Sequence, residues 1–274
     1  MKREPDYSRN NKLVASNQYI KAIHPDKMNL NAMKLFRFTI TQCRLTDEQF
    51  YEYQFKVRDL AREFQIPDKD MYRDIKSMCI YLMQMILKIE TDQGDWELKH
   101  IFETAKYEGK TGTVTLQLHK DMTALFLQLK TNFTRIPIVN ILSMRSKYAI
   151  RIYELICEKM LGHYPYADEI TEIDISLEEI RQATGTTNKK TYKIMSNLKN
   201  IILYPALKEI EQVAAWKIIV EDIKTGRSIT GFHMTVWSEY GYRHHEKLKA
   251  AGQPEELVVS NGTNVQMNLL DYNI

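Results

Sequence analysis

The chain has 274 residues, 44% of them hydrophobic and 10% aromatic, which suffices for one large domain or two ordinary domains with packed cores. Its formal net charge of +3 is too small for the whole molecule to attract polyanions, so a nucleic-acid site would have to come from local charge placement. No stretch approaches the roughly 18 apolar residues of a membrane span, and the first residues lack the apolar core of a signal peptide, so a cytoplasmic protein with no membrane partner is expected.

The first half of the chain alternates between helical and strand periodicity. Residues 1–28 are expected to form an N-terminal arm, followed by a first domain at residues 29–136. Apolar residues at helical spacing predict a helix from Leu30 to Cys43, with Asn29 or Asn31 as its cap. The elements predicted after it are a strand at Phe50–Val57, helices at Arg58–Phe64 and Lys69–Ile86, and strands around Trp96–Tyr107 and Thr113–His119, joined by a GKTG turn.

The second half repeats this order in a domain expected at residues 137–241, after a connection at Asp121–Ile141. Its predicted elements are a helix at Met144–Met160, a strand near Ile173, helices at Leu177–Thr184 and Lys189–Leu203, and strands at Ala214–Ile223 and Ile229–Trp237, joined by a KTGR turn. Helix, strand, helix-turn-helix and β-hairpin thus occur twice. This succession predicts an α+β fold of two tandem winged-helix domains related by internal duplication.

The remaining residues, 242–274, form a polar and turn-rich tail that ends in the apolar run VQMNLLDYNI. This composition favours partial disorder, and packing of the apolar end back onto the fold is the alternative.

The second helix of the second domain, residues 189–203, has the charge pattern of a DNA-reading helix; we call it the recognition segment. At 100° per residue its apolar side gathers Thr191, Ile194, Met195, Leu198, Ile201 and Ile202, and its other side gathers Lys189, Tyr192, Lys193, Ser196, Lys199 and Asn200. No Asp or Glu occurs from Thr186 to Lys208, whereas a generic solvated face mixes both signs. A lysine-rich surface helix without a nucleic-acid partner is the alternative.

Two groups of contacts with DNA are predicted around this helix. The residues expected to read base edges in the major groove are Asn188, Lys189, Tyr192, Lys193 and Ser196. The residues expected to contact phosphates are Lys190 and Lys199, and, from a second acid-free stretch at Lys130–Tyr153, Arg135, Arg145, Lys147 and Arg151. Arg227, in the turn of the wing hairpin, is expected at the backbone or in the adjacent minor groove, with a solvated turn arginine as the alternative.

The corresponding helix of the first domain carries a weaker version of this pattern. Its predicted DNA contacts are Lys69, Arg73, Lys76 and Ser77, together with Lys110 in the hairpin turn. Asp70 and Asp74 lie on the same face, so the first domain is expected to contribute less affinity.

Patterns for catalysis, metals and cofactors are missing from the sequence. Cys43, Cys79 and Cys157 are widely spaced and form no CxxC pair, which indicates buried free thiols in a reducing compartment. The histidines are dispersed, and the adjacent His244 and His245 lack the spacing of a rolling-circle initiator's metal-binding pair. No HExxH, P-loop or nucleophile-elbow motif is present, so no enzyme, no metal and no cofactor is expected.

Two segments resemble iteron-binding plasmid replication initiators, the theta-type, RepB/RepE-like Initiator Replication family. SMRSKYAIRIYELI, Ser143 to Ile156, is similar to that family's S-x-Y-x-I-R-x-Y-E-L run. TYKIMSNLKNIILYPALKEI, Thr191 to Ile210, is similar to its recognition helix and following P-A-x-x-E-I run, although Glu211 replaces a frequent Asn. The likeness spans roughly residues 12–240.

The resemblance implies a set of functions that periodicity does not reveal. They are binding of repeated double-stranded origin DNA (iterons), local strand opening, recruitment of the host initiator and replicative helicase, and autorepression by a dimer in equilibrium with a monomer. A winged-helix transcriptional repressor without a replication role is the main alternative, because it would use the same fold and the same cationic residues. A protein-interaction module predicts a mixed-sign or apolar recognition face instead, which this sequence lacks.

Overall fold

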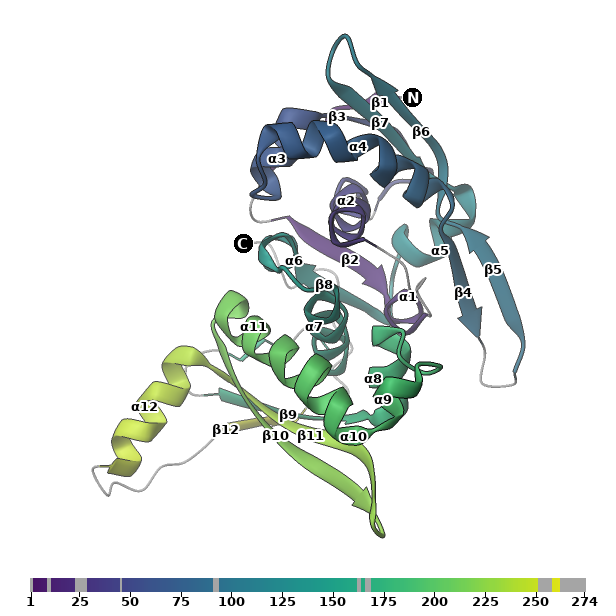
Figure 1. Cartoon of the computed structure of the whole chain (residues 1–274). Helices are drawn as coiled ribbons and strands as arrows, with labels where there is room; N and C mark the ends of the chain where they lie inside the picture. The colour runs from purple at the N-terminus through teal and green to yellow at the C-terminus, as the bar shows by residue number, and fades with distance from the viewer. Residues whose placement is uncertain are drawn as a thin grey trace. The chain divides into compact units, whose positions relative to one another are not determined.

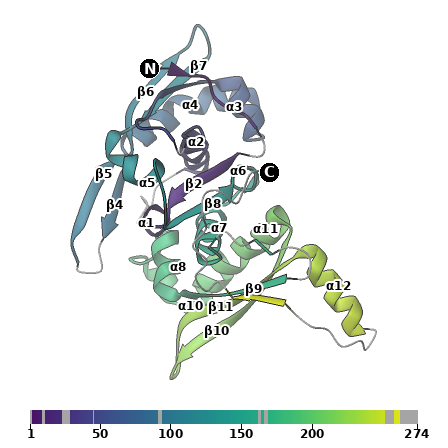
Figure 2. The same ribbon diagram turned by 180° about the vertical axis from the view of Figure 1, so that it is seen from behind.

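The computed structural model describes residues 2–8, 11–22, 29–44, 46–90, 94–161, 164–165, 169–250 and 258–261. The chain divides into two compact units, residues 1–147 and 148–274, drawn in Figure 1 and from behind in Figure 2. The division falls just before Tyr148, inside the segment that the sequence assigned to the second domain. In the described part of the chain, no helix combines the length and apolarity needed to cross a membrane.

Unit 1 is built from a four-stranded sheet of order β1-β3-β7-β6, two separate two-stranded ribbons, β2-β8 and β4-β5, and several helices. Its elements in chain order are β1 (Lys2–Arg3), β2 (Lys12–Ser16), α1 (Asn17–Lys21), α2 (Leu30–Ile40), β3 (Glu52–Lys56), α3 (Val57–Glu63), α4 (Asp68–Met83), β4 (Ile86–Glu90), β5 (Trp96–His100), β6 (Phe102–Glu108), β7 (Thr113–Leu118), the 3-10 turn η1 (Lys120–Met122), α5 (Thr123–Phe126), β8 (Phe133–Pro137) and α6 (Ile138–Ser143). The helix-turn-helix is α3–α4, and the first wing is the β6–β7 hairpin.

Helix α2 forms the centre of unit 1, and Figures 1 and 2 both show it between α4 and β2. It begins where the Asn29 side chain accepts a hydrogen bond from the Ala32 amide at 2.8 Å, as expected for a cap. Phe36 and Phe38 are buried and contact aromatic rings from several neighbouring elements. This aromatic core holds α3 and α4 in place.

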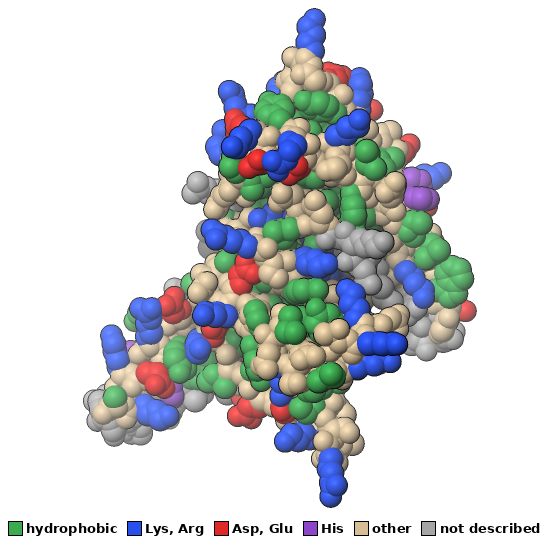
Figure 3. Space-filling view, viewed as in Figure 1, with side chains coloured by type: hydrophobic (Ala, Val, Ile, Leu, Met, Phe, Trp, Pro, Cys, Tyr) green, Lys and Arg blue, Asp and Glu red, His purple; other side chains and the backbone are tan. Residues whose placement is uncertain are grey.

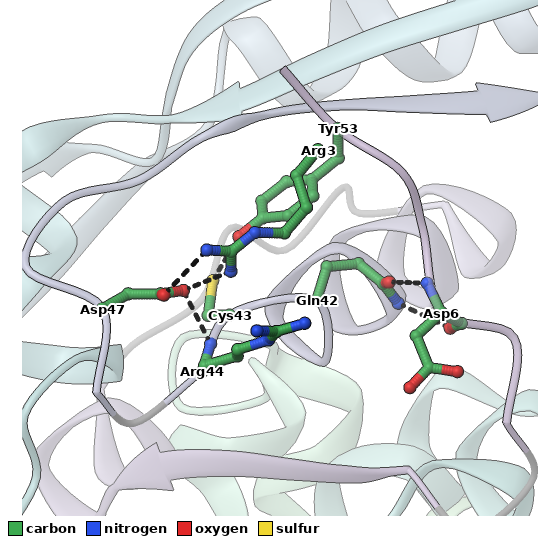
Figure 4. A network of polar contacts seen from close by, with 7 residues as sticks. All are labelled: Arg3, Asp6, Gln42, Cys43, Arg44, Asp47 and Tyr53. Atoms are coloured by element: carbon green, nitrogen blue, oxygen red, sulfur yellow. Dashed lines mark hydrogen bonds and ion pairs between the residues drawn. The ribbon is translucent and has the colours of Figure 1, made fainter. Parts of the chain in front are cut away.

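The N-terminal residues belong to the sheet and ribbon of unit 1. β1 pairs in parallel with β3, and β2 pairs antiparallel with β8. Arg3 donates two hydrogen bonds to the Asp47 carboxylate at 2.6 and 2.9 Å, and Asp47 also accepts from the Arg44 amide (Figure 4). Burial alone would raise the pKa of Asp47, but these hydrogen bonds hold it below its ordinary value.

A hairpin that the sequence analysis missed follows α4. Its strand β4 pairs with β5 from Ile86–His100 to Glu90–Trp96. Leu87 and Ile89 are buried, whereas Ile86, Trp96 and Leu98 on the opposite face are exposed. The predicted helix ended at Ile86, which is instead the first residue of β4. The strand predicted around Trp96–Tyr107 is divided into β5, which completes this separate ribbon, and β6.

Unit 2 has a four-stranded sheet of order β10-β11-β9-β12. Its elements are α7 (Lys147–Lys159), β9 (Glu169–Ser176), α8 (Leu177–Thr184), α9 (Lys190–Lys193), α10 (Met195–Asn197), the π-helical segment η2 (Leu198–Leu203), α11 (Tyr204–Ala214), β10 (Trp216–Thr225), β11 (Ser228–Ser238), α12 (Glu239–Ala250) and β12 (Val258–Asn261). Figures 1 and 2 show α7, α8 and α11 on one face of the sheet, with the β10–β11 hairpin, the second wing, extending beyond it.

The tail expected to be partly disordered, residues 242–274, contains most of α12 and all of β12, and β12 pairs in parallel with β9. The rest of that prediction, residues 251–257 and 262–274, lies outside the described residues.

Candidate DNA-binding surface

The second helix-turn-helix begins with a helix whose two ends are fixed by local side-chain chemistry. The Ser176 hydroxyl accepts from the Glu179 amide at 3.2 Å, and the Glu179 carboxylate accepts from the Ser176 amide at 2.8 Å, which makes a capping box. Gly185 ends α8 with φ 63°, a left-handed conformation that favours glycine. Thr186 is buried, and its hydroxyl lies 3.0 Å from that of Thr184. The turn leading to the recognition segment is therefore rigid.

The recognition segment is not the continuous helix expected from the sequence. Ile194 is extended, with φ −74° and ψ 117°, and separates α9 from α10. The Asn197 side-chain amide donates to the Thr191 carbonyl at 3.1 Å across this break, so one of the freed backbone groups is satisfied. After the break the chain continues through η2 into α11, with Pro205 in the first turn of that helix.

The break changes which side chains face the core. Leu198 and Ile202 are buried as expected, but Thr191, Ile194 and Ile201 are exposed, the last two at 57% and 51%. The predicted apolar side is therefore wrong at those three positions. The extended Ile194 interrupts the 100° periodicity at the first two, and Ile201 lies in the π-helical segment η2, where that periodicity does not hold.

The predicted base-reading residues lie at the beginning of this segment. Asn188, Lys193 and Ser196 are exposed, and Lys189 and Tyr192 are half-buried. Lys190, predicted for phosphate, is exposed beside them. Within the described residues, Lys189, Lys190 and Lys193 form no ion pair with an acidic side chain. Figure 3 shows Lys and Arg side chains gathered beside α8 and α9.

Lys199 departs from its predicted role in phosphate binding. Its ammonium group contacts both carboxylate oxygens of Asp222 on β10, at 2.6 and 2.7 Å. Burial lowers the pKa of Lys199, but hydrogen bonds and charge interactions with Asp222 and Tyr204 outweigh it, so the pKa lies above its ordinary value. This lysine is already paired inside unit 2.

Arg151 also departs from its predicted role, because its side chain is only 4% exposed. It contacts the fully buried Glu154 carboxylate at 2.6 Å and donates to the Ala183 carbonyl at 3.2 Å. The family-like run around Arg151 therefore forms part of the core, where it joins α7 to the end of α8.

The remaining predicted phosphate contacts are accessible to different degrees. Arg145 is exposed, whereas Lys147 and Arg135 are half-buried. The Arg135 guanidinium lies 5.5 Å from the Phe133 ring centroid.

Arg227 stands at the tip of the second wing, after Gly226, whose φ is 62°. Both Arg227 and Lys224 are exposed there, and Figure 3 shows a basic side chain at this tip. Lys224 was missed as a candidate, although the turn sequence KTGR contains both cations.

The first helix-turn-helix exposes its predicted cations but pairs one of them. Lys69, Lys76, Ser77 and, in the hairpin turn, Lys110 are exposed. Arg73 lies 2.8 Å from both Asp70 and Asp74. The hydrogen bond and charge of Arg73 lower the pKa of Asp74. The acidic residues expected to reduce the positive charge of this face therefore do so by forming ion pairs with Arg73.

Comparison with known proteins identifies both units. Residues 12–157 match the family described as Initiator Replication protein, WH1, and residues 176–236 match Initiator Rep protein, WH2. Among solved structures, the Pi initiator protein in complex with iteron DNA has a TM-score of 0.68 at 18% identity, with 84% of this chain and 98% of that chain covered. Domains 2 and 3 of RctB give a TM-score of 0.45 at 10% identity, covering 77% of this chain and 83% of that chain. Among curated proteins, no match is found.

These matches confirm the predicted α+β architecture of two tandem winged-helix domains. The first family model alone covers more than half of the chain, and the two models together account for both helix-turn-helix motifs. The chain belongs to the Initiator Replication protein family.

Proposed function

We propose that this protein initiates replication of its own replicon by binding directly repeated origin DNA through the second helix-turn-helix. The observation that carries the proposal is the exposed, acid-free cation group at the beginning of the recognition segment. A lysine without an acidic partner can replace the counterions of a phosphate or donate to a base edge without first breaking an ion pair. Family membership favours an initiator over a plain repressor.

The two units have different shares of the contact in this proposal. Asn188, Lys189, Tyr192, Lys193 and Ser196 read base edges, because they lie in the first turns of the recognition segment, which is the part of such a helix that contacts bases.

Backbone contacts fix the register in both units. They come from Lys190, Arg227, Arg145, Lys147 and Arg135, and from Lys69, Lys76, Ser77 and Lys110 of unit 1.

The later steps rest on the family alone. They are local opening of the origin, recruitment of the host initiator and replicative helicase, and repression of the protein's own promoter by a dimer. The solved Pi protein was captured on iteron DNA, which supports the first step, binding of repeats. We propose no chemical catalysis by this chain.

Binding is tested by titrating the purified full-length protein into labelled duplexes that carry the repeats flanking its reading frame. Scrambled duplexes of equal length and composition are the control. We expect the repeats to bind at least about a thousand-fold more tightly than scrambled DNA at physiological salt, as specific DNA-binding proteins do. Equal affinity for both duplexes would refute sequence-specific reading.

Replication is tested separately by placing the reading frame and its flanking repeats on a DNA circle without another origin. Maintenance of the circle is expected in the native host after it has lost its own copy of the replicon, so that the test circle is the sole source of the protein. If binding is tight and specific but the circle is lost, the protein is a repressor and the initiator proposal fails.

A further inference from the structure

The second wing leaves its sheet at a defined point. β9 pairs with β11 only as far as Ser176 opposite Gly231, so the ribbon continues beyond that pair with two strands. A Cβ at Gly231 would lie 2.8 Å from the Ile175 carbonyl oxygen, which shows how closely β11 crosses the end of β9. We call this point the wing root.

The ribbon changes direction immediately after the root. Ile223 pairs with Gly231, but the next pair is Lys224 with Ile229, so Thr230 is the extra residue of a β-bulge. A bulge bends a strand and increases its twist. The direction of the tip, with Lys224 and Arg227, is therefore set by whatever holds the strands at the root.

Lys199 of the recognition segment holds the wing at this root. Asp222 is the last β10 residue before the Ile223–Gly231 pair, and its cross-strand neighbour is the buried Phe232. The Lys199 ammonium lies within 2.7 Å of both Asp222 oxygens and 5.7 Å from the Phe232 ring centroid. One side chain from the helical layer thus contacts both strands of the ribbon where the third strand ends.

We infer that Lys199 and Asp222 are a positioning pair that fixes the angle of the second wing against the recognition segment, and that neither residue contacts DNA. The inference rests on the proposed function, since it assigns the pair a role in DNA binding. Fixing this angle keeps the wing-tip cations in register with Lys190 and Lys193, so that both groups engage one duplex together. A loosely held wing would lose conformational entropy when it binds DNA, and part of its contact with the duplex would not form.

The direction of the change in DNA affinity caused by Asp222→Asn separates a positioning role from a simple charge effect. Asp222→Asn removes a negative charge close to the proposed DNA surface, so charge alone predicts tighter binding. Loss of the positioning pair predicts weaker binding. Glu221→Gln is the matched control, because Glu221 is exposed on the neighbouring position of the same strand and its side chain points to the opposite face.

The binding experiment measures affinity for the repeats as a function of salt concentration. We expect Asp222→Asn and Lys199→Met each to weaken binding about 3- to 10-fold and to lower the salt slope by about one, the change that accompanies loss of one phosphate contact. Glu221→Gln is expected to bind as well as the wild type or better. Lys199→Arg, which keeps the charge and the donors, is expected to restore most of the affinity.

Coupling to the wing tip is the second readout. In the wild type, Arg227→Ala is expected to weaken binding about 5-fold, but less than about 2-fold in the Lys199→Met background, because the mispositioned tip no longer engages DNA. Additive losses, or tighter binding by Asp222→Asn, would overturn the inference and return Lys199 to a direct phosphate contact.

A measurement without DNA keeps the inference testable if the wild type fails to bind the repeats. Spin labels at Ser228→Cys on the second wing and Gln212→Cys on α11, in a Cys43→Ser background, report the distance distribution between the wing and the helical layer. Both labelled positions are exposed in unit 2. We expect a broader distribution in Lys199→Met and in Asp222→Asn than in the parent or in Glu221→Gln. Identical widths in all four proteins would refute the positioning pair.

Discussion

The second helices of the two helix-turn-helix motifs hold their cations in opposite ways. On α4, Arg73 lies between Asp70 and Asp74, and all three side chains belong to the same exposed face. On the recognition segment, Lys190 and Lys193 are exposed with no acidic residue in the surrounding sequence. The same fold therefore presents a locally neutralised helix in unit 1 and a bare cationic turn in unit 2.

The two wings differ in a similar way. In the turn of the first wing, Gly112 lies so close to α4 that an added Cβ would be 2.7 Å from the Tyr72 hydroxyl. Gly226 of the second wing has open space around it. The turn of the first wing thus lies against its own helix α4, whereas the turn of the second wing has open space around Gly226 among the described residues. Both comparisons favour the proposal that unit 2 reads the sequence and that unit 1 supports it.

The largest expected effect tests whether α7 is framework or DNA surface. Arg151→Ala removes the guanidinium that contacts the fully buried Glu154, which is expected to lower the free energy of unfolding by about 3 to 5 kcal/mol. Urea denaturation measures this change. A loss below about 1 kcal/mol together with a reduced salt slope for DNA binding would show that Arg151 contacts phosphate after all.

Glycine substitutions test the difference between the root and the tip of the second wing. Gly231→Ala places its Cβ against the Ile175 backbone, and such overpacking is expected to cost about 1 to 3 kcal/mol of stability. Gly226→Ala meets no neighbour and should cost only about 1 kcal/mol, from its left-handed conformation. Thermal unfolding measures the loss of stability in both variants. An equal loss, or a larger loss in Gly226→Ala, contradicts the close crossing of β11 and β9 at the wing root.

A matched pair of lysine substitutions tests the proposal that unit 2 reads the base sequence. Lys193→Ala is expected to weaken binding to the repeats by about 1 to 2 kcal/mol and to leave scrambled DNA almost unaffected, because a base contact carries the discrimination. Lys76→Ala, on the corresponding helix of unit 1, should cost no more than about 0.5 kcal/mol on either duplex. Titration of each variant into the repeat duplex and the scrambled duplex measures both changes in affinity. Equal losses for the two variants would remove the difference between the units.

The smallest expected effect concerns the neutralised face of α4. The double substitution Asp70→Asn and Asp74→Asn releases Arg73, and we expect about 3-fold tighter binding with a salt slope steeper by about one. Asp68→Asn removes a carboxylate from the same helix without releasing Arg73, so its gain should be smaller. If all these changes leave affinity unaltered, α4 does not face DNA.

Elements fixed by neighbouring residues were predictable from the sequence. The bounds of α8 were predicted as Leu177–Thr184 and match the structure, because a capping box and a C-terminal glycine act within a few residues of the helix ends. The Asn29 cap and the turn containing Gly226 follow from equally local chemistry.

Features that depend on tertiary contacts were not predictable. Helical periodicity gives no sign that Ile194 is extended, and it counts Ile201 as apolar whether or not a neighbour covers it. Lys199 meets a carboxylate 23 residues away on another element, and no spacing rule connects the two. For Arg151 a signal existed, since Glu154 follows at i+3 and these two are the only charged residues between positions 148 and 157, which indicates an internal ion pair.

The isolation of α9 bears on how such a protein diverges. None of the residues from Lys190 to Lys193 is buried, and the extended Ile194 separates them from the helical turns that pack on the sheet. Substitutions at such surface positions usually change folding stability by no more than about 0.5 kcal/mol. Under the base-reading role proposed for this segment, mutation here alters target preference while the scaffold stays intact, which provides a route for related replicons in one cell to evolve separate origins.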